Sequence, residues 1–460
     1  MFDLTIKEIV ETVDGYKKNI ENDNIIIKKI VIDDREIEKN CAFIAIVGKK
    51  FDGHNFCENA IKKGAYLLVV EKEIKKFPQI VVKNTTKALL DIAALNKSKF
   101  KGKLTGITGS VGKTTTRDML GQILKKSFKT LVTHKNLNNE FGLSKTILNL
   151  DKTYKAAVVE MGMSNLGEIS VLSKTCKPDI GIITNIGVSH LEFLKTRENI
   201  LKAKLEILDG MKKNSPLILN GDDDFLKNLK IKDHKITLCG IKNNINLYSA
   251  KNIKQVLLST VYDLYKKDDF LTQITLPTIG EHNVLNSLIA IATALEHYSV
   301  PIEKIKDALK NFIPSNMRQN ICTINNITAI ADFYNASPAS MKASILTLSK
   351  IPSTGKKIAV LGSMLELGNI SKEEHYKIGK FAVKNNVDFL YCYGEETKDM
   401  IIGANEAKEE QQKNCTIKHF KDKKDLICCL KENIMAKDVI LFKASLKMNF
   451  EEIFNAFLSF

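Results

Sequence analysis

The chain has 460 residues, of which 44% are hydrophobic, and this apolar content excludes disorder as its main state. At roughly 150 residues per domain, the length predicts about three domains. The net charge is +16, but only four of the 69 basic residues are arginines, and the lysines are spread over the whole chain. This distribution favours a solvated lysine surface over a nucleic-acid site.

The cysteines and the apolar segments exclude the secreted and membrane classes. Nine cysteines occur, an odd number, and none forms a Cys-x-x-Cys pair. No secretory hydrophobic segment follows Met1, because Asp3 and Glu8 interrupt it. The apolar runs at 66–70 and 287–292 are far too short to span a bilayer. These features predict a cytoplasmic protein with reduced thiols and no membrane span.

The first 97 residues predict a small α/β domain, because short apolar runs alternate with charged turns. These runs lie at residues 25–27, 42–47, 66–70 and 80–82. A second boundary is expected near residue 313, where Asn311-Phe-Ile-Pro-Ser-Asn316 breaks the preceding helical pattern. The predicted domains are residues 1–97, 98–313 and 314–460.

The middle region shows the alternation of strands and helices that is typical of a mainly parallel sheet. Residues 104–108 predict a buried strand, and an apolar helical pattern from Met119 to Phe128 follows it. Further strands of this region are expected at residues 156–161, 180–184, 217–220 and 236–239. The last region repeats the pattern, with strands expected at residues 327–331, 358–361, 389–391 and 439–442. The fold class predicted is therefore α/β.

A phosphate-binding loop is predicted after the strand at residues 104–108. The segment Gly106-Ile-Thr-Gly-Ser-Val-Gly-Lys-Thr-Thr-Thr116 follows this strand and opens an amphipathic helix, which is the context that such a loop requires. Lys113 would supply a charge to the β- and γ-phosphate oxygens, and the Thr114 hydroxyl can bind Mg²⁺. The residues expected to hold the phosphates are Thr108, Gly109, Ser110, Val111, Gly112, Lys113 and Thr114.

Two side chains that follow neighbouring strands are candidates for the same crevice. Glu160 ends the run Ala-Ala-Val-Val, and a carboxylate at the carboxyl end of a buried strand faces the crevice where ligands bind in such sheets. It is a candidate Mg²⁺ ligand, the alternative being a glutamate that points to water. His190 lies just beyond the next strand, where it either reaches the same rim or serves as a structural hydrogen-bonding group.

Lys204 is predicted to lie on the buried side of a helix over residues 200–208, whereas Lys202 and Glu206 point the other way. The apolar face around it consists of Ile200, Leu201, Ala203, Leu205, Ile207 and Leu208. A lysine so placed must extend its amine to water, find a counter-charge or be chemically altered. One such alteration is uptake of CO₂ as a carbamate, an anion that can bridge metal ions.

This set of motifs resembles the Mur ligases of bacterial cell-wall synthesis, over nearly the whole chain. The phosphate loop matches that family's variant, in which the first glycine is missing, as it is at Ile107. The segment Asp332-Phe-Tyr-Asn-Ala-Ser-Pro-Ala-Ser-Met341 is close to the signature of the branch that adds D-alanyl-D-alanine. The other matching segments are 33–35, 51–54, 136–142, 160–162, 203–207, 280–286, 317–318 and 361–368.

The resemblance implies a role for each matched residue. It implies that Glu160 and His190 bind magnesium beside Thr114, and that Lys204 is carbamylated and helps to hold a second magnesium with His190. The residues implied in catalysis are Lys113, Lys204, His190 and Glu160. The nucleotide contacts implied beyond the loop are Asn283, Asn286, Arg318 and Asp332. The substrate contacts implied are Asp34, Arg35, Asp52, Gly53, His54, Asn136, Asn138, Asn139 and Asn335.

The implied reaction is ATP-dependent addition of D-alanyl-D-alanine to UDP-N-acetylmuramoyl-tripeptide. ATP phosphorylates the terminal carboxylate to an acyl phosphate, the dipeptide amine attacks it, and phosphate leaves. The resemblance further implies ATP and Mg²⁺ as cofactors, no nucleic-acid partner and a monomer. It implies a UDP-binding N-terminal domain, a central P-loop domain and a Rossmann-like C-terminal domain that closes over the site.

The chain departs from the family pattern at three places. Asp34 stands where the family usually has serine, and Val47 replaces a frequent lysine. The sequence Phe442-Lys-Ala-Ser-Leu446 replaces Lys-Gly-Ser-Arg, so a weaker contact is expected from Lys443.

Three other functions fit the sequence less well than the ligase. A folylpolyglutamate-type ligase shares the central chemistry, but the extra N-terminal domain and the segment 332–341 disfavour it. A basic nucleic-acid ATPase needs clustered arginines and aromatic platforms, whereas this chain has no tryptophan and 7% aromatic residues. A non-catalytic nucleotide-binding module is disfavoured because nothing in the phosphate loop is degraded.

Overall fold

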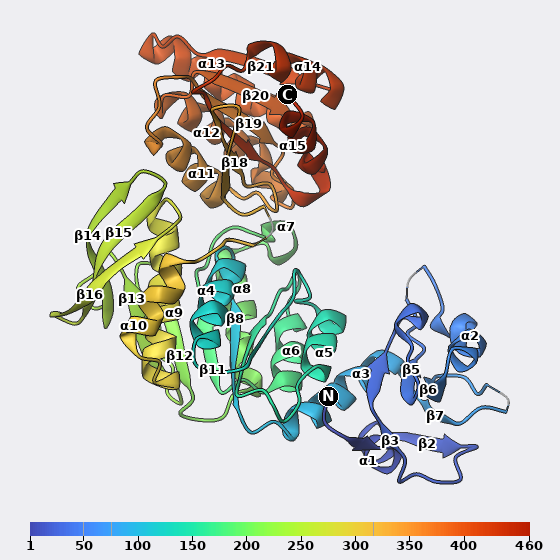
Figure 1. Cartoon of the computed structure of the whole chain (residues 1–460). Coiled ribbons are helices and arrows are strands. Elements are labelled where there is room, and N and C mark those ends of the chain that lie inside the picture. The colour runs from blue at the N-terminus through green and yellow to red at the C-terminus, as the bar shows by residue number, and fades with distance from the viewer. Residues whose placement is uncertain (49, 75, 316) are drawn as a thin grey trace.

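The computed structural model describes residues 1–460 except Lys49, Lys75 and Asn316. It contains three α/β units, each built on its own main sheet, and the N-terminal unit projects to one side of the central one (Figure 1). The predicted three-domain α/β fold is thereby confirmed, while the domain boundaries stay a prediction. Asn316, which belongs to the predicted second boundary, lies outside the described residues.

The N-terminal unit is a five-stranded sheet with helices around it. The strands in spatial order are β2 (Gly15–Lys18), β7 (Gln79–Val82), β6 (Ala65–Val70), β5 (Cys41–Ile44) and β4 (Lys29–Val31). Only β2 runs antiparallel to its neighbour in this sheet. The remaining elements are a short pair, β1 (Leu4–Thr5) with β3 (Ile26–Ile27), and the helices α1 (Ile6–Thr12), α2 (Cys57–Lys62) and α3 (Thr85–Ser98).

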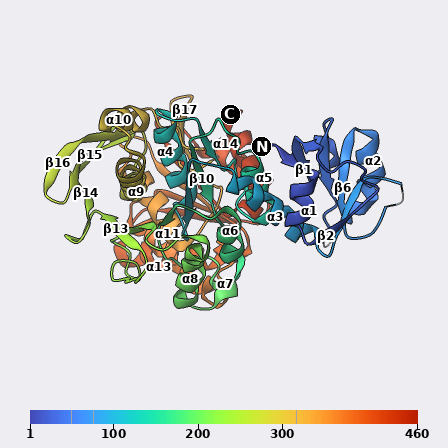
Figure 2. The same cartoon turned by 90° about the horizontal axis from the view of Figure 1, so that it is seen from below.

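Helix α3 attaches the N-terminal unit to the central one (Figure 2). It packs against α5 (Glu140–Leu148) and α6 (Glu168–Cys176). Asn96 of α3 is fully buried, and its Nδ2 donates to the carbonyls of Ile147 and Leu150 at 2.9 and 3.0 Å. The two units therefore share one hydrophobic core across this contact.

The central unit is a nine-stranded sheet. Its strands in spatial order are β16 (Asp269–Leu276), β15 (Ser259–Lys266), β14 (Tyr248–Val256), β13 (Lys235–Gly240), β12 (Pro216–Asn220), β11 (Ile180–Ile183), β8 (Lys103–Thr108), β10 (Ala156–Glu160) and β9 (Thr130–Val132). The strands from β9 to β14 are parallel, and β15 and β16 are antiparallel. The parallel part was predicted, whereas the antiparallel extension at residues 248–276 was missed.

Strand β10 shows why the parallel strands in the middle of the sheet have continuous apolar sequences. Ala157 and Val159 belong to the core shared with α5 and α6, whereas Ala156 and Val158 belong to the core on the opposite face. Successive side chains of a strand point to opposite faces, so a strand that is covered on both sides has no polar alternation. The opposite face is covered by α4 (Lys113–Lys125), α9 (Glu281–Tyr298) and α10 (Ile302–Lys310).

The helix that carries Lys204 is shorter than predicted. Helix α8 (Arg197–Leu205) begins at an N-cap, where Thr196 Oγ1 accepts a hydrogen bond from Asn199 N at 3.2 Å. Beyond Leu205 the chain tightens into a 3-10 turn at Glu206–Gly210, whereas the periodicity predicted helix to residue 208. The predicted burial of Lys204 is confirmed, with 2% of its surface exposed, and Lys202 faces solvent.

The C-terminal unit is a six-stranded sheet between helices. Its strands in spatial order are β17 (Asn320–Ile324), β18 (Ile327–Ala331), β22 (Val439–Lys443), β19 (Lys357–Gly362), β20 (Phe389–Tyr393) and β21 (Thr416–Phe420). Only β17 is antiparallel to its neighbour in this sheet. Its helices are α11 (Pro338–Lys350), α12 (Ser371–Lys384), α13 (Lys398–Gln411), α14 (Lys423–Asn433) and α15 (Phe450–Leu458).

Among the described residues, the central and C-terminal units are joined at three places and also pack through Ile279, which belongs to the C-terminal core. The first is the connecting segment, residues 311–319, between α10 and β17. The second is at the β14–β15 turn, where Gln255 Nε2 donates to the Lys350 carbonyl at 3.1 Å. The third lies at α7 (Leu191–Leu194), where Glu192 N donates to the Glu366 carbonyl at 3.4 Å.

Candidate active site

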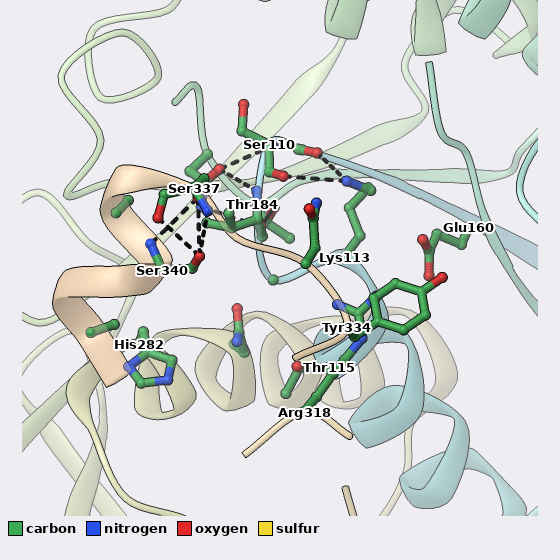
Figure 3. Close-up of a pocket in the computed structure, with 18 of the residues that line it drawn as sticks. Ser110, Lys113, Thr115, Glu160, Thr184, His282, Arg318, Tyr334, Ser337 and Ser340 are labelled. Carbon is green, nitrogen blue, oxygen red and sulfur yellow. Dashed lines mark hydrogen bonds between the residues drawn. The ribbon is translucent and has the colours of Figure 1, made fainter. Parts of the chain in front are cut away.

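A pocket of about 530 Å³ lies between the central and C-terminal units (Figure 3). The central unit contributes the phosphate loop, the ends of neighbouring parallel strands and the start of α9, and the C-terminal unit contributes the start of α11. The predicted site residues that line this pocket are Gly109, Ser110, Val111, Gly112, Lys113, Asn138, Asn139, Glu160, His190, Lys204, Asn283, Asn286, Arg318, Asp332 and Asn335.

The phosphate loop joins β8 to α4 and depends on two glycines. Gly109 and Gly112 have φ angles of 146° and 84°, in the left-handed region that favours glycine. A Cβ at Gly109 would lie 1.9 Å from Thr184 Oγ1, so this backbone also approaches the next strand too closely for a side chain. Lys113 folds back over the loop, and its Nζ donates to the Gly109 carbonyl at 2.7 Å.

Thr184 and Asn185 support the loop, and no role was predicted for either. Asn185 Oδ1 accepts from the backbone N–H groups of Ser110 and Val111 at 3.1 and 3.0 Å, and Thr184 Oγ1 donates to the Val111 carbonyl at 2.6 Å. Both residues follow β11, which is the parallel neighbour of β8. Since the carboxyl ends of adjacent parallel strands meet at one edge, the dipeptide Thr-Asn at the end of the strand predicted over residues 180–184 was the available signal.

Glu160 is fully enclosed by donors at the end of β10. Only 2% of its surface is exposed, and its carboxylate accepts from Thr114 Oγ1 at 2.8 Å, Asn138 Nδ2 at 2.9 Å and Arg117 Nη1 at 3.1 Å. Burial raises the pKa of this carboxyl, but the positive charges of Lys113, Arg117 and Arg318 outweigh burial and hold the pKa below its usual value. Glu160 is therefore an ionised carboxylate directly beside the phosphate loop.

His190 and Lys204 line the same pocket, and burial lowers the pKa of both. Burial, assisted by the charges of Lys113 and Lys204, lowers the pKa of His190 to about 4. Glu366 Oε2 lies 2.9 Å from its Nδ1 but out of line for a hydrogen bond, so this contact does not offset the burial. Burial, together with the charge of Lys113, also lowers the pKa of Lys204 well below its ordinary value.

The oxygen groups beside the phosphate loop suit a Mg²⁺ ion that is bound together with a nucleotide. They suit less well a metal ion that is bound by protein side chains alone. Among the described residues, no group of three or more histidine, cysteine, aspartate or glutamate side chains could hold a metal ion. Mg²⁺ takes oxygen ligands, and in nucleotide sites it uses one or two protein groups together with phosphate oxygens and water. The Glu160 carboxylate and the Thr114 hydroxyl, 2.8 Å apart beside the loop, fit that requirement.

The residues predicted on the nucleotide side come from both units. Asn283 and Asn286 lie in the first turns of α9, and Asn286 Oδ1 accepts from Thr116 Oγ1 of α4 at 3.3 Å. Arg318 stacks on the ring of Tyr334, 4.0 Å from its centroid, and Figure 3 shows this pair next to Glu160. Tyr334 was not predicted as a site residue, although the matched segment 332–341 contains it.

Asp332 is held by a buried lysine. Lys443 Nζ lies 2.9 Å from Asp332 Oδ2 and donates to the carbonyl of Asn335 at 2.8 Å, and Ser344 Oγ donates to Asp332 Oδ2 at 2.5 Å. Only 2% of Lys443 is exposed. Lys443 thus forms a buried ion pair that secures the loop at residues 332–335, and its contact with a ligand stays a prediction.

The predicted residues of the N-terminal unit lie outside this pocket. Asp34 pairs with Lys63 at 2.7 Å, whereas the Arg35 side chain is 82% exposed and pairs only with neighbouring Asp33, at 2.6 Å, among the described residues. The side chains of the turn at residues 52–54 contact groups of the same unit. His54 Nδ1 lies 2.5 Å from Asp52 Oδ1, and its Nε2 accepts from Glu71 N at 2.9 Å.

Three predicted residues stand beside the pocket instead of in its lining. Thr108 and Thr114 are buried at the end of β8 and the start of α4. Asn136 is exposed in the loop at residues 133–139, which follows β9. Asn139 of the same loop lines the pocket and caps α5, because its Oδ1 accepts from Gly142 N at 2.9 Å.

Family models match three consecutive parts of the chain. Residues 26–96 match the Mur ligase family, catalytic domain; residues 107–294 match the Mur ligase middle domain; and residues 317–446 match the Mur ligase, glutamate ligase domain. Within the part of the chain that the structure describes, no helix is both long and apolar enough to cross a membrane.

Full-length relatives share one name. The chain is 35% identical over 458 residues to the UDP-N-acetylmuramoyl-tripeptide–D-alanyl-D-alanine ligase of Bacillus subtilis, covering 98% of both chains. It is similar to a crystal structure of MurF from Acinetobacter baumannii, with 30% identity, coverage of 100% and 99%, and a TM-score of 0.91. It is also similar to the MurF ligase of Thermotoga maritima in complex with ADP, with 28% identity, coverage of 94% and 97%, and a TM-score of 0.84.

Proposed function

The chain belongs to the Mur ligase family, and we propose that it is the member that joins D-alanyl-D-alanine to UDP-N-acetylmuramoyl-tripeptide. It is an ATP-dependent ligase of peptidoglycan precursor synthesis that forms ADP and phosphate. The observation that carries the function is the full-length similarity to ligases of that name, combined with one pocket that contains the phosphate loop and the matched segment 332–341.

The phosphoryl transfer is served by charges that are in place before the reaction. The loop and Lys113 bind the ATP phosphates, and the Lys113 ammonium neutralises the charge that develops on the transferring group. The terminal carboxylate of the tripeptide attacks the γ-phosphorus, giving an acyl phosphate and ADP. Asn283, Asn286, Arg318 and Asp332 hold the nucleoside between the two units, so the acceptor carboxylate and the γ-phosphate meet in a fixed geometry.

The second half of the reaction forms the amide bond. The amine of D-alanyl-D-alanine attacks the acyl carbon, loses a proton, and expels inorganic phosphate. Water would hydrolyse the same acyl phosphate, so the enclosure of the pocket by the C-terminal unit protects the intermediate.

Magnesium is the ion that the donor set suits. Glu160 and Thr114 would hold it at the phosphate loop, where it supplies positive charge to the phosphate oxygens. His190, a neutral imidazole beside the pocket, and Lys204 would hold a second ion. We infer that Lys204 is carbamylated, because a buried amine of lowered pKa with no counter-charge among the described residues is a ready nucleophile for CO₂.

The remaining assignments concern the UDP-muramoyl peptide, the oligomeric state and the cell compartment. The N-terminal unit binds the UDP moiety through residues 34–35 and 52–54, and the loop at residues 136–139 with Asn335 contacts the muramoyl peptide. The chain acts as a monomer in the cytoplasm, where ATP is available as the co-substrate.

The test is formation of the UDP-muramoyl-pentapeptide, followed by mass spectrometry and by phosphate release. The wild type is expected to release phosphate in step with product only when ATP, Mg²⁺, tripeptide and dipeptide are all present. Lys204→Ala is expected to lose activity and to regain part of it with a short-chain carboxylic acid, which replaces the carbamate. Lys202→Ala, on the exposed side of the same helix, is the matched control and retains activity.

Two results would contradict these assignments separately. Phosphate release that needs neither the tripeptide nor the dipeptide would overturn the ligase. Full activity of Lys204→Ala would leave the ligase intact and remove the carbamate.

A further inference from the structure

Arg117 is a buried charged side chain outside the residues assigned above. It lies on α4, one helical turn after Lys113, and only 2% of its surface is exposed. Its Nη1 donates to Glu160 Oε2 at 3.1 Å and to the Lys135 carbonyl at 2.7 Å. One guanidinium therefore bonds both the carboxylate at the end of β10 and the loop that contains Asn138, the other amide donor to Glu160.

The opposite edge of the guanidinium is held by Asp118. Arg117 Nε donates to Asp118 Oδ1 at 2.8 Å, and Nη2 lies 2.7 Å from the same oxygen. Asp118 Oδ2 in turn accepts a hydrogen bond from Ser315 Oγ. Ser315 belongs to the segment at 311–319 that connects the central unit to the C-terminal unit, so Arg117 and Asp118 link this segment to Glu160.

The geometry requires an arginine. A planar guanidinium with five donors can bond three acceptors in fixed directions, as it does here, whereas the ammonium of a lysine is a point charge with three donors on a flexible stem. Lysine supplies nearly all the positive charge of this chain, and only four arginines occur. If Glu160 needed only a neutralising charge, the nearby Lys113 and Arg318 would already contribute it.

We propose that Arg117, oriented by Asp118, is a positioning residue that fixes the Glu160 carboxylate for the metal–nucleotide complex and relays to it the position of the connecting segment. This inference rests on the proposed function, since it assigns the metal of the ATP complex to Glu160. Glu160 would keep its bonds to Thr114 and Asn138 without Arg117, but its Oε2 and the loop at residue 135 would lose their common anchor. Metal affinity then falls while the phosphate loop still binds nucleotide.

The experiment measures binding of Mn²⁺, a spin-active substitute for Mg²⁺, to the complex of the full chain with ADP by electron paramagnetic resonance. Arg117→Lys keeps the positive charge and removes the planar guanidinium. It is expected to weaken Mn²⁺ binding about tenfold, because loss of a group that hydrogen-bonds to a metal-binding side chain typically lowers metal affinity by at least that factor. ADP binding in EDTA is expected to change less than about twofold. Lys126→Met, which removes an ion pair with Asp307 near the end of the same helix, is the matched control.

Asp118→Asn keeps Arg117 and weakens its orientation, so a smaller loss of Mn²⁺ affinity is expected, about threefold. This variant also provides the test if Arg117→Lys does not fold. Unchanged Mn²⁺ affinity in whichever of the two variants folds would overturn the proposal. An equal loss of ADP affinity in EDTA would overturn it as well, because the role would then be structural support of the loop. A wild type that binds Mn²⁺ and ADP but makes no pentapeptide would instead count against the proposed function alone.

Discussion

The pocket and the N-terminal unit hold their charged residues in opposite ways. In the pocket, Glu160 and Lys443 are each 2% exposed, and the two partners of each ion pair come from distant parts of the sequence. In the N-terminal unit, the Arg35 side chain is 82% exposed and pairs with Asp33, two residues away. A buried charge must be compensated by the fold, whereas an exposed one is compensated by water. The pocket is thus organised by its own buried ion pairs, whereas the proposed UDP side presents an exposed arginine.

Among the substitutions that test this contrast, Lys443→Met is expected to lower the free energy of unfolding most. Loss of the lysine leaves Asp332 without its buried counter-charge, and breaking such a pair costs about 3–5 kcal/mol of unfolding free energy. Urea denaturation measures this loss. Lys423→Met removes a more exposed pair with Glu452 in the same unit and is expected to cost no more than about 1 kcal/mol. Equal losses in the two variants would remove the distinction between buried and exposed pairs.

Lys113→Met is expected to lower kcat by about 10²–10³-fold, because a charge that stabilises the transferring phosphoryl group is removed. Steady-state kinetics with saturating substrates measure this change. The folded structure should tolerate the substitution, since the Lys113 amine bonds only carbonyls of its own loop among the described residues. A variant that retains wild-type kcat would show that the loop does not serve chemistry.

His375 makes the stability of the C-terminal unit sensitive to acid. Its Nδ1 donates to the Ser371 carbonyl at 2.7 Å, and its Nε2 accepts from Met364 N at 2.9 Å, so the buried ring must be neutral. Burial lowers its pKa in the folded state, so the unfolded chain, with a histidine pKa near 6.5, takes up the proton first. Stability contributed by the neutral ring is present above pH 6.5 and is lost as the pH falls toward the folded pKa.

Between pH 7.5 and 5.5 the free energy of unfolding is expected to fall by at most about 1.4 kcal/mol, which is the limit for a ring that stays neutral in the folded state. Urea denaturation of the wild type and of His375→Gln at both pH values measures it, and the variant should show a correspondingly flatter dependence. An identical pH dependence in the two proteins would exclude His375 as the source.

Arg35→Gln is expected to change the stability of the protein least. The unfolding free energy should move by less than about 0.5 kcal/mol, because the side chain is exposed and pairs only locally. The KM for the UDP substrate should rise about tenfold with kcat unchanged, as expected when a charged contact to a bound substrate is lost. A fall in stability above about 1 kcal/mol would contradict the contrast between the two regions.

Local patterns predicted the elements but not the contacts between them. The phosphate loop is contained in eleven consecutive residues, and the burial of Lys204 follows from the helical spacing of its neighbours, so both could be read from the sequence. The hydrogen bond from Arg117 to Glu160 spans 43 positions, and the bond from Lys443 to the Asp332 carbonyl spans 111. Such pairings depend on strand order, which local periodicity does not encode.

The antiparallel extension was missed for a related reason. Strands β14 to β16 are mixed in polarity, and β16 faces solvent along an exposed edge, with Phe270 and Leu271 partly uncovered. Short apolar runs indicate strands that are buried on both faces, whereas a strand that is covered on only one face alternates apolar and polar residues and contains no such run.

The three contacts between the central and C-terminal units limit how these units can move. A body joined to another at one place can turn freely, and a body joined at two places retains a single axis of rotation. The third contact removes that axis too, so widening the cleft requires at least one of the contacts to separate. Each of the two non-covalent contacts combines a hydrogen bond to a carbonyl with further contacts. Leu258 packs against the C-terminal core beside the bond from Gln255 to Lys350, and His190 lies 2.9 Å from Glu366 beside the bond from Glu192. Cleft width in this enzyme is then expected to change in a step instead of as a continuous drift.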